Sequence, residues 1–412
     1  MNILFLSRWF PFPADNGSKI RVFNLLRQLS RRHTVDLVSF TAGEPIHQAM
    51  AELQRYCRTV KTTPFRPFKP NRLTALMGYF STLPRSVIDM YDQKMQRLII
   101  QTAREGNHQL VIASELDMAI YAQPLRGMVK IIEEAELASL YEQSLNAAAP
   151  AQRLRTALMW QKWVRYIKRI RRQFDGFTVV SRAELDLIEK FDPQDNSEYR
   201  LPPIQIIPNG VSLEDYRGDF GIPLPNTLIY SGALTYHANF DAVSYFIDEI
   251  LPEIRRSQPA VTLTVTGSLQ GVALEKIHGH QGVVFSGYLD DIRPAIAQSW
   301  ASIVPLRIGG GTRLKILESL AIGTPVISTR KGAEGLDLKD GSDILLANSA
   351  PDFASQTLRL LNDPALRNSL SRNGKIAITN QYDWDTIGSQ FCNYIEQIAA
   401  NNKNHEPYPL VS

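Results

Sequence analysis

Residues that could bind a phosphate-containing ligand are concentrated in one segment of the chain. Three consecutive glycines, Gly309–Gly311, are followed by Thr312 and by two cations, Arg313 and Lys315. Glycines let backbone N–H groups approach a ligand, and a helix that begins near Thr312 would direct its positive end at the same point. Glu318 follows about 1.5 turns later, where a carboxylate could accept hydrogen bonds from sugar hydroxyls. The segment predicts a site for a nucleotide-sugar diphosphate, although such a turn can also serve only to pack a helix on a sheet.

Loops after three other expected strands could contribute to the same site. Glycine turns follow the strands Thr227–Tyr230 and Val261–Thr266, and the loop 330–336 follows Val326–Ser328. In open α/β sheets, ligands bind at the carboxyl ends of the strands, which is where these loops begin. The residues assigned to the nucleotide sugar in these loops are Gly232, His237, Gly267 and Glu334.

A proline-rich loop, residues 8–19, leaves the first expected strand of the chain. It contains Asn16 and Gly17, and we expect them to lie beside the second substrate, the acceptor of the sugar. Gly17 would allow a close approach to a ligand, and Asn16 or Ser18 could cap the following helix. The prolines and aromatic residues of this loop could alternatively do no more than shape it.

Carboxylates follow two further strands of the first half. Glu115 comes after the strand Gln109–Ala113, and Glu134 comes after the strand Val129–Ile132. In a parallel sheet both acids would lie at the ligand-binding edge, where they could assist a leaving group or orient an acceptor hydroxyl. Acids at helix N-termini that only interact with the helix dipole are the alternative interpretation.

Composition describes an ordinary globular protein of two domains. The chain has 412 residues, of which 44% are hydrophobic and 21% charged, and this length is too great for one core. A net charge of +4 gives no reason to expect nucleic-acid binding. Two distant cysteines favour a reducing compartment over a disulfide framework or a zinc site. We find no signal peptide and no apolar run of about 18–20 residues, so we expect a cytoplasmic protein.

Apolar runs alternate with helical periodicity through both halves of the chain, which predicts an α/β fold with parallel sheets. The polar, proline-containing stretch 192–203 marks a domain boundary. The predicted architecture is two Rossmann-like, doubly wound domains that face a cleft. Its predicted parts are a first domain (1–203), a second domain (204–382), a C-terminal helix (383–400) that packs back on the first domain, and a tail (401–412).

Two segments combine basic with large apolar side chains. Residues 61–85 contain no acid and interleave Arg and Lys with Phe, Leu, Met and Tyr. This mixture suits an anionic lipid surface or a lipid-linked substrate, and a packed helix with solvated basic edges explains it equally well. Residues 153–172 predict a basic helix with an apolar stripe from Ala157 to Phe174, for which core packing is the favoured interpretation. From these two segments we hypothesise that the protein makes peripheral contact with the inner face of a membrane.

These motifs, taken in order, resemble those of the GT-B retaining glycosyltransferases of family 4. The resemblance rests on the N-terminal glycine loop, the junction 207–211 and the segment 309–327, and it covers nearly the whole chain. It implies that the second domain binds a UDP- or GDP-activated donor and the first a saccharide or lipid-linked acceptor. It also implies retention of anomeric configuration, no metal or other cofactor, and a role in polysaccharide or glycolipid assembly.

The resemblance assigns roles to single residues and shows two departures from the family pattern. Glu318 matches the second glutamate of the family's Glu-x7-Glu pattern, which binds the donor ribose, but Gly310 stands in place of the first. The family's basic pair after the first strand of the second domain is also absent, because His237 occupies that loop. The diphosphate is therefore assigned to Arg313 and Lys315, which with Glu318 form the expected catalytic set.

Two other functions stay open from the sequence. A sugar-nucleotide epimerase uses the same architecture, and Glu115, Glu133 and Glu134 could act on its sugar. A non-catalytic protein that binds nucleotide sugars is the second alternative, because the first glutamate and the basic pair are absent.

Overall fold

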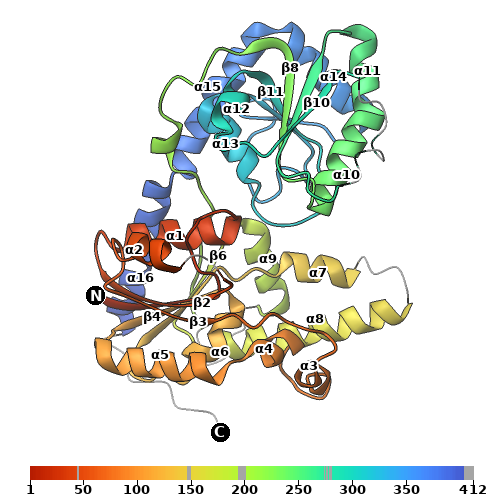
Figure 1. Ribbon diagram of the computed structural model, residues 1–412. Helices are drawn as coiled ribbons and strands as arrows, with labels where there is room; N and C mark the ends of the chain where they lie inside the picture. The colour runs from red at the N-terminus through yellow and green to blue at the C-terminus, as the bar shows by residue number, and fades with distance from the viewer. Residues whose placement is uncertain are drawn as a thin grey trace. The chain divides into compact units, whose positions relative to one another are not determined.

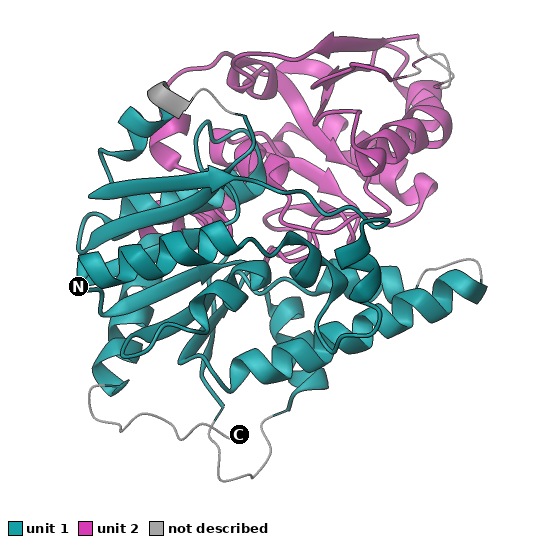
Figure 2. Ribbon diagram, turned by 60° about the horizontal axis from the view of Figure 1, so that its bottom comes forward, with its two compact units in different colours: residues 1–208, 387–412 teal, residues 209–386 magenta. Residues whose placement is uncertain are grey.

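A computed structural model of the chain describes residues 1–43, 46–145, 150–193, 201–272, 274, 277 and 281–402. The chain forms two compact units, coloured separately in Figure 2: unit 1 is residues 1–208 and 387–412, and unit 2 is residues 209–386. Each unit has its own parallel sheet, which confirms the predicted α/β class. Within the described residues, no helix is both long and apolar enough to cross a lipid bilayer.

The sheet of unit 1 contains seven strands among the described residues. The strands are β1 (Asn2–Ser7), β2 (Thr34–Thr41), β3 (Thr59–Pro64), β4 (Leu110–Ser114), β5 (Val129–Glu133), β6 (Gly176–Val179) and β7 (Ile204–Ile206). Their order, β3-β2-β1-β4-β5-β6-β7, is that of a doubly wound sheet. The central strands β1 and β4 are apolar and buried, because a parallel sheet of this kind is covered on both faces.

Helices cover both faces of this sheet. They are α1 (Gly17–Leu29), α2 (Ile46–Leu53), α3 (Leu73–Met77), α4 (Arg85–Met90), α5 (Gln93–Gly106), α6 (Ala119–Ala122), α7 (Ala138–Leu145), α8 (Pro150–Arg171), α9 (Arg182–Phe191) and α16 (Trp384–Asn402). Figure 1 shows α1 and α16 on one face and α5 and α8 on the other. The cap predicted for α1 is confirmed, since the Asn16 side chain accepts a hydrogen bond from the Lys19 amide at 3.1 Å.

Unit 2 repeats the same winding with six strands in its described part. The strands are β8 (Leu224–Ser231), β9 (Thr262–Thr266), β10 (Val283–Gly287), β11 (Ser299–Val304), β12 (Val326–Ser328) and β13 (Leu345–Leu346). Their order is β10-β9-β8-β11-β12-β13, with all neighbours parallel. The helices are α10 (His237–Tyr245), which continues through Phe246–Ile250 into α11 (Leu251–Ser257), then α12 (Arg293–Ala297), α13 (Leu314–Ile322), α14 (Ala350–Asn362) and α15 (Pro364–Gln381).

The units divide after Pro208, and not after residue 203 as the sequence analysis expected. Strand β7, which was assigned to the second domain, pairs with β6 through Phe177 and Ile204 and therefore belongs to unit 1. Part of the predicted boundary stretch, 194–200, lies outside the described residues.

The C-terminal helix α16 packs on unit 1 from Ile387 onward. The Tyr394 hydroxyl accepts a hydrogen bond from the Phe177 amide and donates to the Pro203 carbonyl oxygen, both at 2.8 Å. The helix extends to Asn402, so the predicted start of a tail at residue 401 is wrong. Residues 403–412 lie outside the described part of the chain.

A buried ion pair joins helix α1 to the sheet of unit 1. The Arg21 Nε donates to Glu133 Oε1 at 2.6 Å, and its Nη2 donates to the Ile207 carbonyl oxygen at 2.9 Å. The hydroxyl of Ser114 donates to the other oxygen of the Glu133 carboxylate at 2.8 Å. Both charged side chains are 0% exposed, so removal of one would leave the other charge buried without its closest counter-charge.

We expect Arg21→Met to lower the free energy of unfolding of unit 1 by about 3–5 kcal/mol, because it breaks a buried ion pair. Urea denaturation followed by circular dichroism measures this loss. Arg182→Met is the matched control, since it removes only an exposed pair with Asp186 and should leave the transition unchanged within error. An unchanged transition in the Arg21 variant would contradict this role of the ion pair.

Candidate functional site

The glycine loop, Gly309–Thr312, connects β11 to α13 in unit 2. Helix α13 begins at Leu314, slightly later than the predicted start at the end of the loop. The Arg313 side chain is buried and folds back on this loop, where its Nη2 donates to the Gly309 carbonyl oxygen at 2.7 Å and its Nη1 donates to that of Gly310. In this structure Arg313 therefore fixes the shape of the loop, which the sequence analysis did not anticipate.

Lys315 lies in the first turn of α13 and points toward the elements that follow β8. Its ammonium donates to the Asn239 side-chain oxygen at 3.1 Å and lies 4.0 Å above the centre of the Tyr230 ring. Burial and the neighbouring Arg313 charge lower the pKa of Lys315 to about 7, while the Glu318 carboxylate acts in the opposite direction. A small change in its surroundings is therefore enough to change the charge of this lysine at neutral pH.

Two predicted glycines let the ends of β8 and β9 come close to Lys315. A Cβ atom on Gly232 would lie 2.7 Å from the Lys315 Nζ and 2.9 Å from the Asn239 Nδ2. A Cβ atom on Gly267 would lie 2.6 Å from the backbone nitrogen of Ala233, in the loop after β8. Any other residue at either position would displace these groups, so the glycines are required for the close approach.

Glu318 lies one turn after Lys315 on the same helix. The Tyr216 hydroxyl, from the short helical turn Leu213–Tyr216, donates a hydrogen bond to its carboxylate. Burial raises the pKa of Glu318, whereas the hydrogen bond from Tyr216 and the charge of Lys315 lower it. Helix α13 therefore presents a partly buried cation and a partly buried acid next to the glycine loop.

The remaining predicted residues of unit 2 have different surroundings. The Thr312 hydroxyl accepts a hydrogen bond from the Asn209 side-chain amide at 3.0 Å, which connects the glycine loop to the start of the unit. His237 is exposed at the first turn of α10. Glu334 forms an ion pair with Lys331 at 2.5 Å, so its carboxylate already faces a cation of its own loop.

In unit 1, Glu115 follows β4 and lies among polar side chains. Its carboxylate accepts a hydrogen bond from the Trp9 indole nitrogen at 2.5 Å and lies 3.7 Å from the Arg8 guanidinium. Arg8 also pairs with Asp117 at 2.8 Å. Burial raises the pKa of Glu115 to about 7, and the Asp117 carboxylate adds to this effect against the charge of Arg8. This carboxyl group can therefore exchange a proton near neutral pH.

Glu134 follows β5, the strand that pairs with β4, so the two predicted acids lie at the same edge of the sheet. Burial raises the pKa of Glu134 well above its usual value, although the Arg21 guanidinium is 3.8 Å away. Its Oε2 atom has no hydrogen-bond partner among the described residues. Glu115 and Glu134 have φ angles of 68° and 59°, a strained conformation that is found preferentially at functional sites.

The other two predicted residues of unit 1 lie at the start of α1. The side-chain oxygen of Asn16 is used in capping this helix. Gly17 is the first helical residue, and a Cβ atom there would meet nothing within 4 Å, so packing within the protein does not require a glycine.

The sequence of residues 225–363 matches a family model described as glycosyl transferases group 1. This stretch includes most of β8, the glycine loop, and helices α10 and α13 with Lys315 and Glu318. Unit 2 is a group 1 glycosyltransferase domain. The predicted relationship to glycosyltransferases is thus confirmed, while the assignment to family 4 stays a prediction.

Proteins of known name are similar to this chain in sequence or in structure. Glycogen synthase from Mycobacterium tuberculosis is 26% identical over 253 residues, which are 58% of this chain and 57% of that protein. The chain thus spans little more than half the length of this relative. Sucrose-phosphate synthase from Thermosynechococcus elongatus has a similar structure, with a TM-score of 0.69, 18% identity, and coverage of 97% of this chain and 100% of that chain.

HepE from Anabaena, solved in complex with UDP-glucose, has a TM-score of 0.64 and 14% identity, and covers 96% of this chain and 100% of its own. These similarities extend over both units, and at such identities they show the fold alone. They confirm that the protein has the two Rossmann-like domains of the GT-B class.

The structure gathers part of the predicted donor-side residues of the glycosyltransferase domain around Lys315. Gly309 lies against the start of α10, since a Cβ atom on it would be 3.1 Å from both Ala238 and the Tyr236 hydroxyl. The residues joined by these contacts are Gly232, Gly267, Gly309, Gly310, Arg313, Lys315 and Glu318. Their roles toward a ligand stay predictions.

Three residues around this site were not assigned a role by the sequence analysis. Tyr230 and Asn239 surround the ammonium of Lys315, and Tyr216 donates to Glu318. Asn239 lies in the first turn of α10, close after the glycine turn that follows β8, so its position was a usable signal. Nothing in the local sequence distinguishes Tyr216, because it reaches Glu318 only through the fold.

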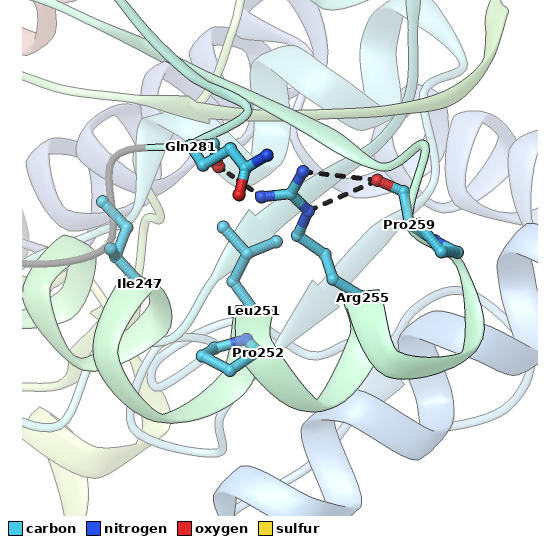
Figure 3. A pocket seen from close by; sticks show the side chains of 6 residues that line it. All are labelled: Ile247, Leu251, Pro252, Arg255, Pro259 and Gln281. Atoms are coloured by element: carbon cyan, nitrogen blue, oxygen red, sulfur yellow. Dashed lines mark hydrogen bonds between the residues drawn. The ribbon is translucent and has the colours of Figure 1, made fainter.

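A hollow of about 430 Å³ lies elsewhere in the glycosyltransferase domain, beside α11 (Figure 3). Its lining contains none of the predicted site residues and consists of Ile247, Leu251, Pro252, Arg255, Pro259 and Gln281. The Arg255 guanidinium donates to the carbonyl oxygens of Gln281 at 2.5 Å and Pro259 at 3.4 Å. The one cation of this lining therefore holds the two loops together, and we assign no ligand to the hollow.

We expect the Lys315 ammonium to titrate with a midpoint near pH 7, because its burial disfavours the charged form. Carbon NMR of protein labelled at the lysine Cε measures this titration, and the resonance lost in Lys315→Met identifies the residue. If that resonance does not titrate between about pH 5 and pH 9, the described environment of Lys315 is wrong.

Proposed function

We propose that the protein is a glycosyltransferase that moves a sugar from a nucleoside diphosphate donor to a hydroxyl acceptor. The observation that carries this proposal is the partly buried Lys315, which lies beside the glycine loop inside a group 1 glycosyltransferase domain. A diphosphate would stabilise the charged form of this lysine, and their attraction is stronger in a buried site than in water. The similar proteins include a glycogen synthase, a sucrose-phosphate synthase and a protein solved in complex with UDP-glucose. These similarities support a sugar nucleotide as the donor.

On the donor side, Lys315 binds the diphosphate and stabilises the negative charge that develops on it when the sugar leaves. Arg313 acts as a positioning residue, because it holds the Gly309 and Gly310 carbonyl oxygens and so fixes the loop whose amides approach the ligand. Glu318 accepts hydrogen bonds from the donor ribose, and the Tyr216 hydroxyl orients its carboxylate.

The proposal includes transfer with retention of anomeric configuration and without a metal ion. The amides of the glycine loop, the N-terminus of α13 and the Lys315 ammonium supply positive charge and hydrogen-bond donors for the diphosphate. In a front-face attack, the departing diphosphate accepts the proton of the acceptor hydroxyl, so charge stabilisation at this helix end is the main catalytic contribution.

Unit 1 binds the acceptor in this proposal. The carboxyl groups of Glu115 and Glu134 lie at one sheet edge and are able to accept hydrogen bonds from acceptor hydroxyls. Asn16 and Gly17 begin α1, whose N-terminus follows the neighbouring strand β1. A saccharide or lipid-linked acceptor fits these polar groups, and the proposed role is polysaccharide or glycolipid assembly in the cytoplasm.

We expect Lys315→Met to weaken the binding of UDP-glucose or of GDP-mannose, whichever the wild type binds, by roughly 10–100-fold, since a charge-assisted hydrogen bond is lost. In the wild type, the ammonium is charged below a pKa of about 7 and neutral above it, so affinity should fall by about tenfold between pH 6 and pH 8. The diphosphate of a nucleotide sugar does not titrate in this range. Isothermal titration calorimetry at the two pH values measures both effects.

Lys375→Met, on the exposed surface of α15, is the matched control and should bind as the wild type does. The pH dependence should also disappear in Lys315→Met. Wild-type affinity in that variant would remove Lys315 from the donor site.

A prolonged incubation with donor alone tests the reaction itself. With a panel of UDP- and GDP-linked sugars, we expect slow hydrolysis of one donor that first releases the sugar in the donor's own anomeric configuration and is insensitive to EDTA. Proton NMR follows the sugar as it is released. A new nucleotide sugar would identify an epimerase instead, and an unchanged panel would favour the non-catalytic alternative.

Release of the opposite anomer would contradict retention, and loss of turnover with EDTA would contradict metal independence.

A further inference from the structure

Large apolar side chains of unit 1 are exposed on α3, on the turn after it and on the first half of α8. The most exposed is Phe80 at 96%, followed by Leu73 at 72%, Leu154 at 65% and Met77 at 61%. Leu76 and Leu158 are also exposed, and we call these six residues the α3–α8 face. Exposed apolar groups that lie together in this way mark an interaction site more often than scattered ones do.

Direct contacts join the two parts of the α3–α8 face. The Lys162 ammonium on α8 donates to the carbonyl oxygens of Gly78 at 2.7 Å and Tyr79 at 2.9 Å, in the turn that follows α3. Leu158 and Leu154 precede Lys162 by four and eight residues, and this spacing puts all three on the same side of the helix. The view in Figure 1 shows α3 next to α8.

The core-facing stripe of α8 is separate from this surface. The stripe is buried in the core of unit 1 at Trp160, Ile167, Ile170 and Phe174, which confirms the favoured interpretation of core packing for this part. Ala157, where the predicted stripe begins, is exposed. Leu154 and Leu158 are not part of the core cluster, so core packing does not explain the apolar side chains at these two positions.

Buried polar contacts hold the segment around α3 in place. The Arg85 side chain donates to the carbonyl oxygens of Ala75 at 2.8 Å and Pro70 at 2.7 Å. The buried Asp89 carboxylate accepts hydrogen bonds from the Lys69 amide at 2.9 Å and from the Arg72 guanidinium at 2.9 Å. Arg72 and Arg85 therefore stabilise the segment and do not contribute the lipid-facing charge that the sequence suggested, while the apolar side chains stay outside.

Positive charge flanks the α3–α8 face. Arg66 and Lys69 are exposed before α3, and Arg153 and Arg155 are exposed on either side of Leu154. The sequence segments 61–85 and 150–172 contain no Asp or Glu. A partner for this face must therefore accept apolar side chains at its centre and carry negative charge around them, which is the chemistry of an anionic lipid surface.

We propose that the α3–α8 face docks on the surface of an anionic lipid bilayer. Phe80, Leu73 and Met77 enter the boundary between headgroups and acyl chains. The exposed Arg66, Lys69, Arg153 and Arg155 contact the anionic headgroups. This inference uses none of the residues assigned to the donor, so it stands independently of the proposed reaction.

Vesicle flotation of the full chain tests this proposal. The protein should float with vesicles that contain about 30% phosphatidylglycerol in phosphatidylcholine, and much less with phosphatidylcholine alone. The triple variant Leu73→Ser, Met77→Ser and Phe80→Ser should lose at least tenfold in vesicle affinity, since all three side chains are exposed and their loss leaves the core intact. Arg66→Gln with Lys69→Gln should weaken the binding by about fivefold for each charge, and less at high salt.

Matched controls lie on unit 2. The double variant Ile222→Ser and Ile376→Ser changes equally exposed apolar residues, and Arg372→Gln with Lys375→Gln removes two exposed charges of α15. Both should bind vesicles as the wild type does. Circular dichroism and an unchanged thermal midpoint establish that the triple variant is folded.

Wild-type protein that fails to float with anionic vesicles overturns the proposal, as does a folded triple variant that floats normally. Light scattering provides a further decisive result. A dimer that the triple variant abolishes would mean that a second copy of the chain covers this face instead of lipid.

Discussion

The partial burial of a single ammonium group, that of Lys315, is the constraint on which the arrangement beside the glycine loop of unit 2 depends. A cation removed from water is unfavourable unless other groups replace its hydration. Around Lys315 the fold supplies an amide oxygen from Asn239, the face of Tyr230 and the nearby Glu318 carboxylate. Gly232 leaves room for them, since a side chain there would collide with the ammonium. The compensation is incomplete, as the lowered pKa of Lys315 shows, and an anionic ligand would complete it.

One buried ion pair of unit 1, by contrast, has its charges well compensated. Arg21 and Glu133 form a close ion pair with further hydrogen bonds on both partners, and they connect a helix to the sheet of unit 1. Glu134 is buried and Glu115 is partly buried at the ends of neighbouring strands. Both are less well paired, and their pKa values are raised. Well-paired buried charges stabilise this scaffold, whereas poorly paired ones lie at the edges where ligands bind in such sheets.

Much of the fold was predictable because parallel strands are apolar on both faces. Strands such as β1, β4 and β11 read as apolar runs, and their positions follow from sequence. Strand β3 was missed, since its Thr-rich sequence lies at a sheet edge and carries no such signal. Strand β7 was recognised but placed in the wrong domain, because only its pairing with β6 shows which sheet it joins.

The candidate site was predictable in part, because some of its features are local in the sequence. The glycine turns and the positions of Lys315 and Glu318 on one helix are local features, and they were visible in the order of the residues. The inward turn of Arg313 onto its own loop was not visible, because rotamers depend on the packing around them.

By itself, then, the sequence determined the alternation of strands and helices, the glycine turns at strand ends and the residue types available for chemistry. Only the tertiary structure decided which of those residues are charged, buried or exposed. Lys315 meets Asn239 across 76 residues of chain, and Lys162 meets the turn after α3 across 84. The burial of a side chain and its contact partners depend on such distant contacts. The pKa of a lysine and the exposure of an apolar helix face therefore cannot be predicted from a local sequence pattern.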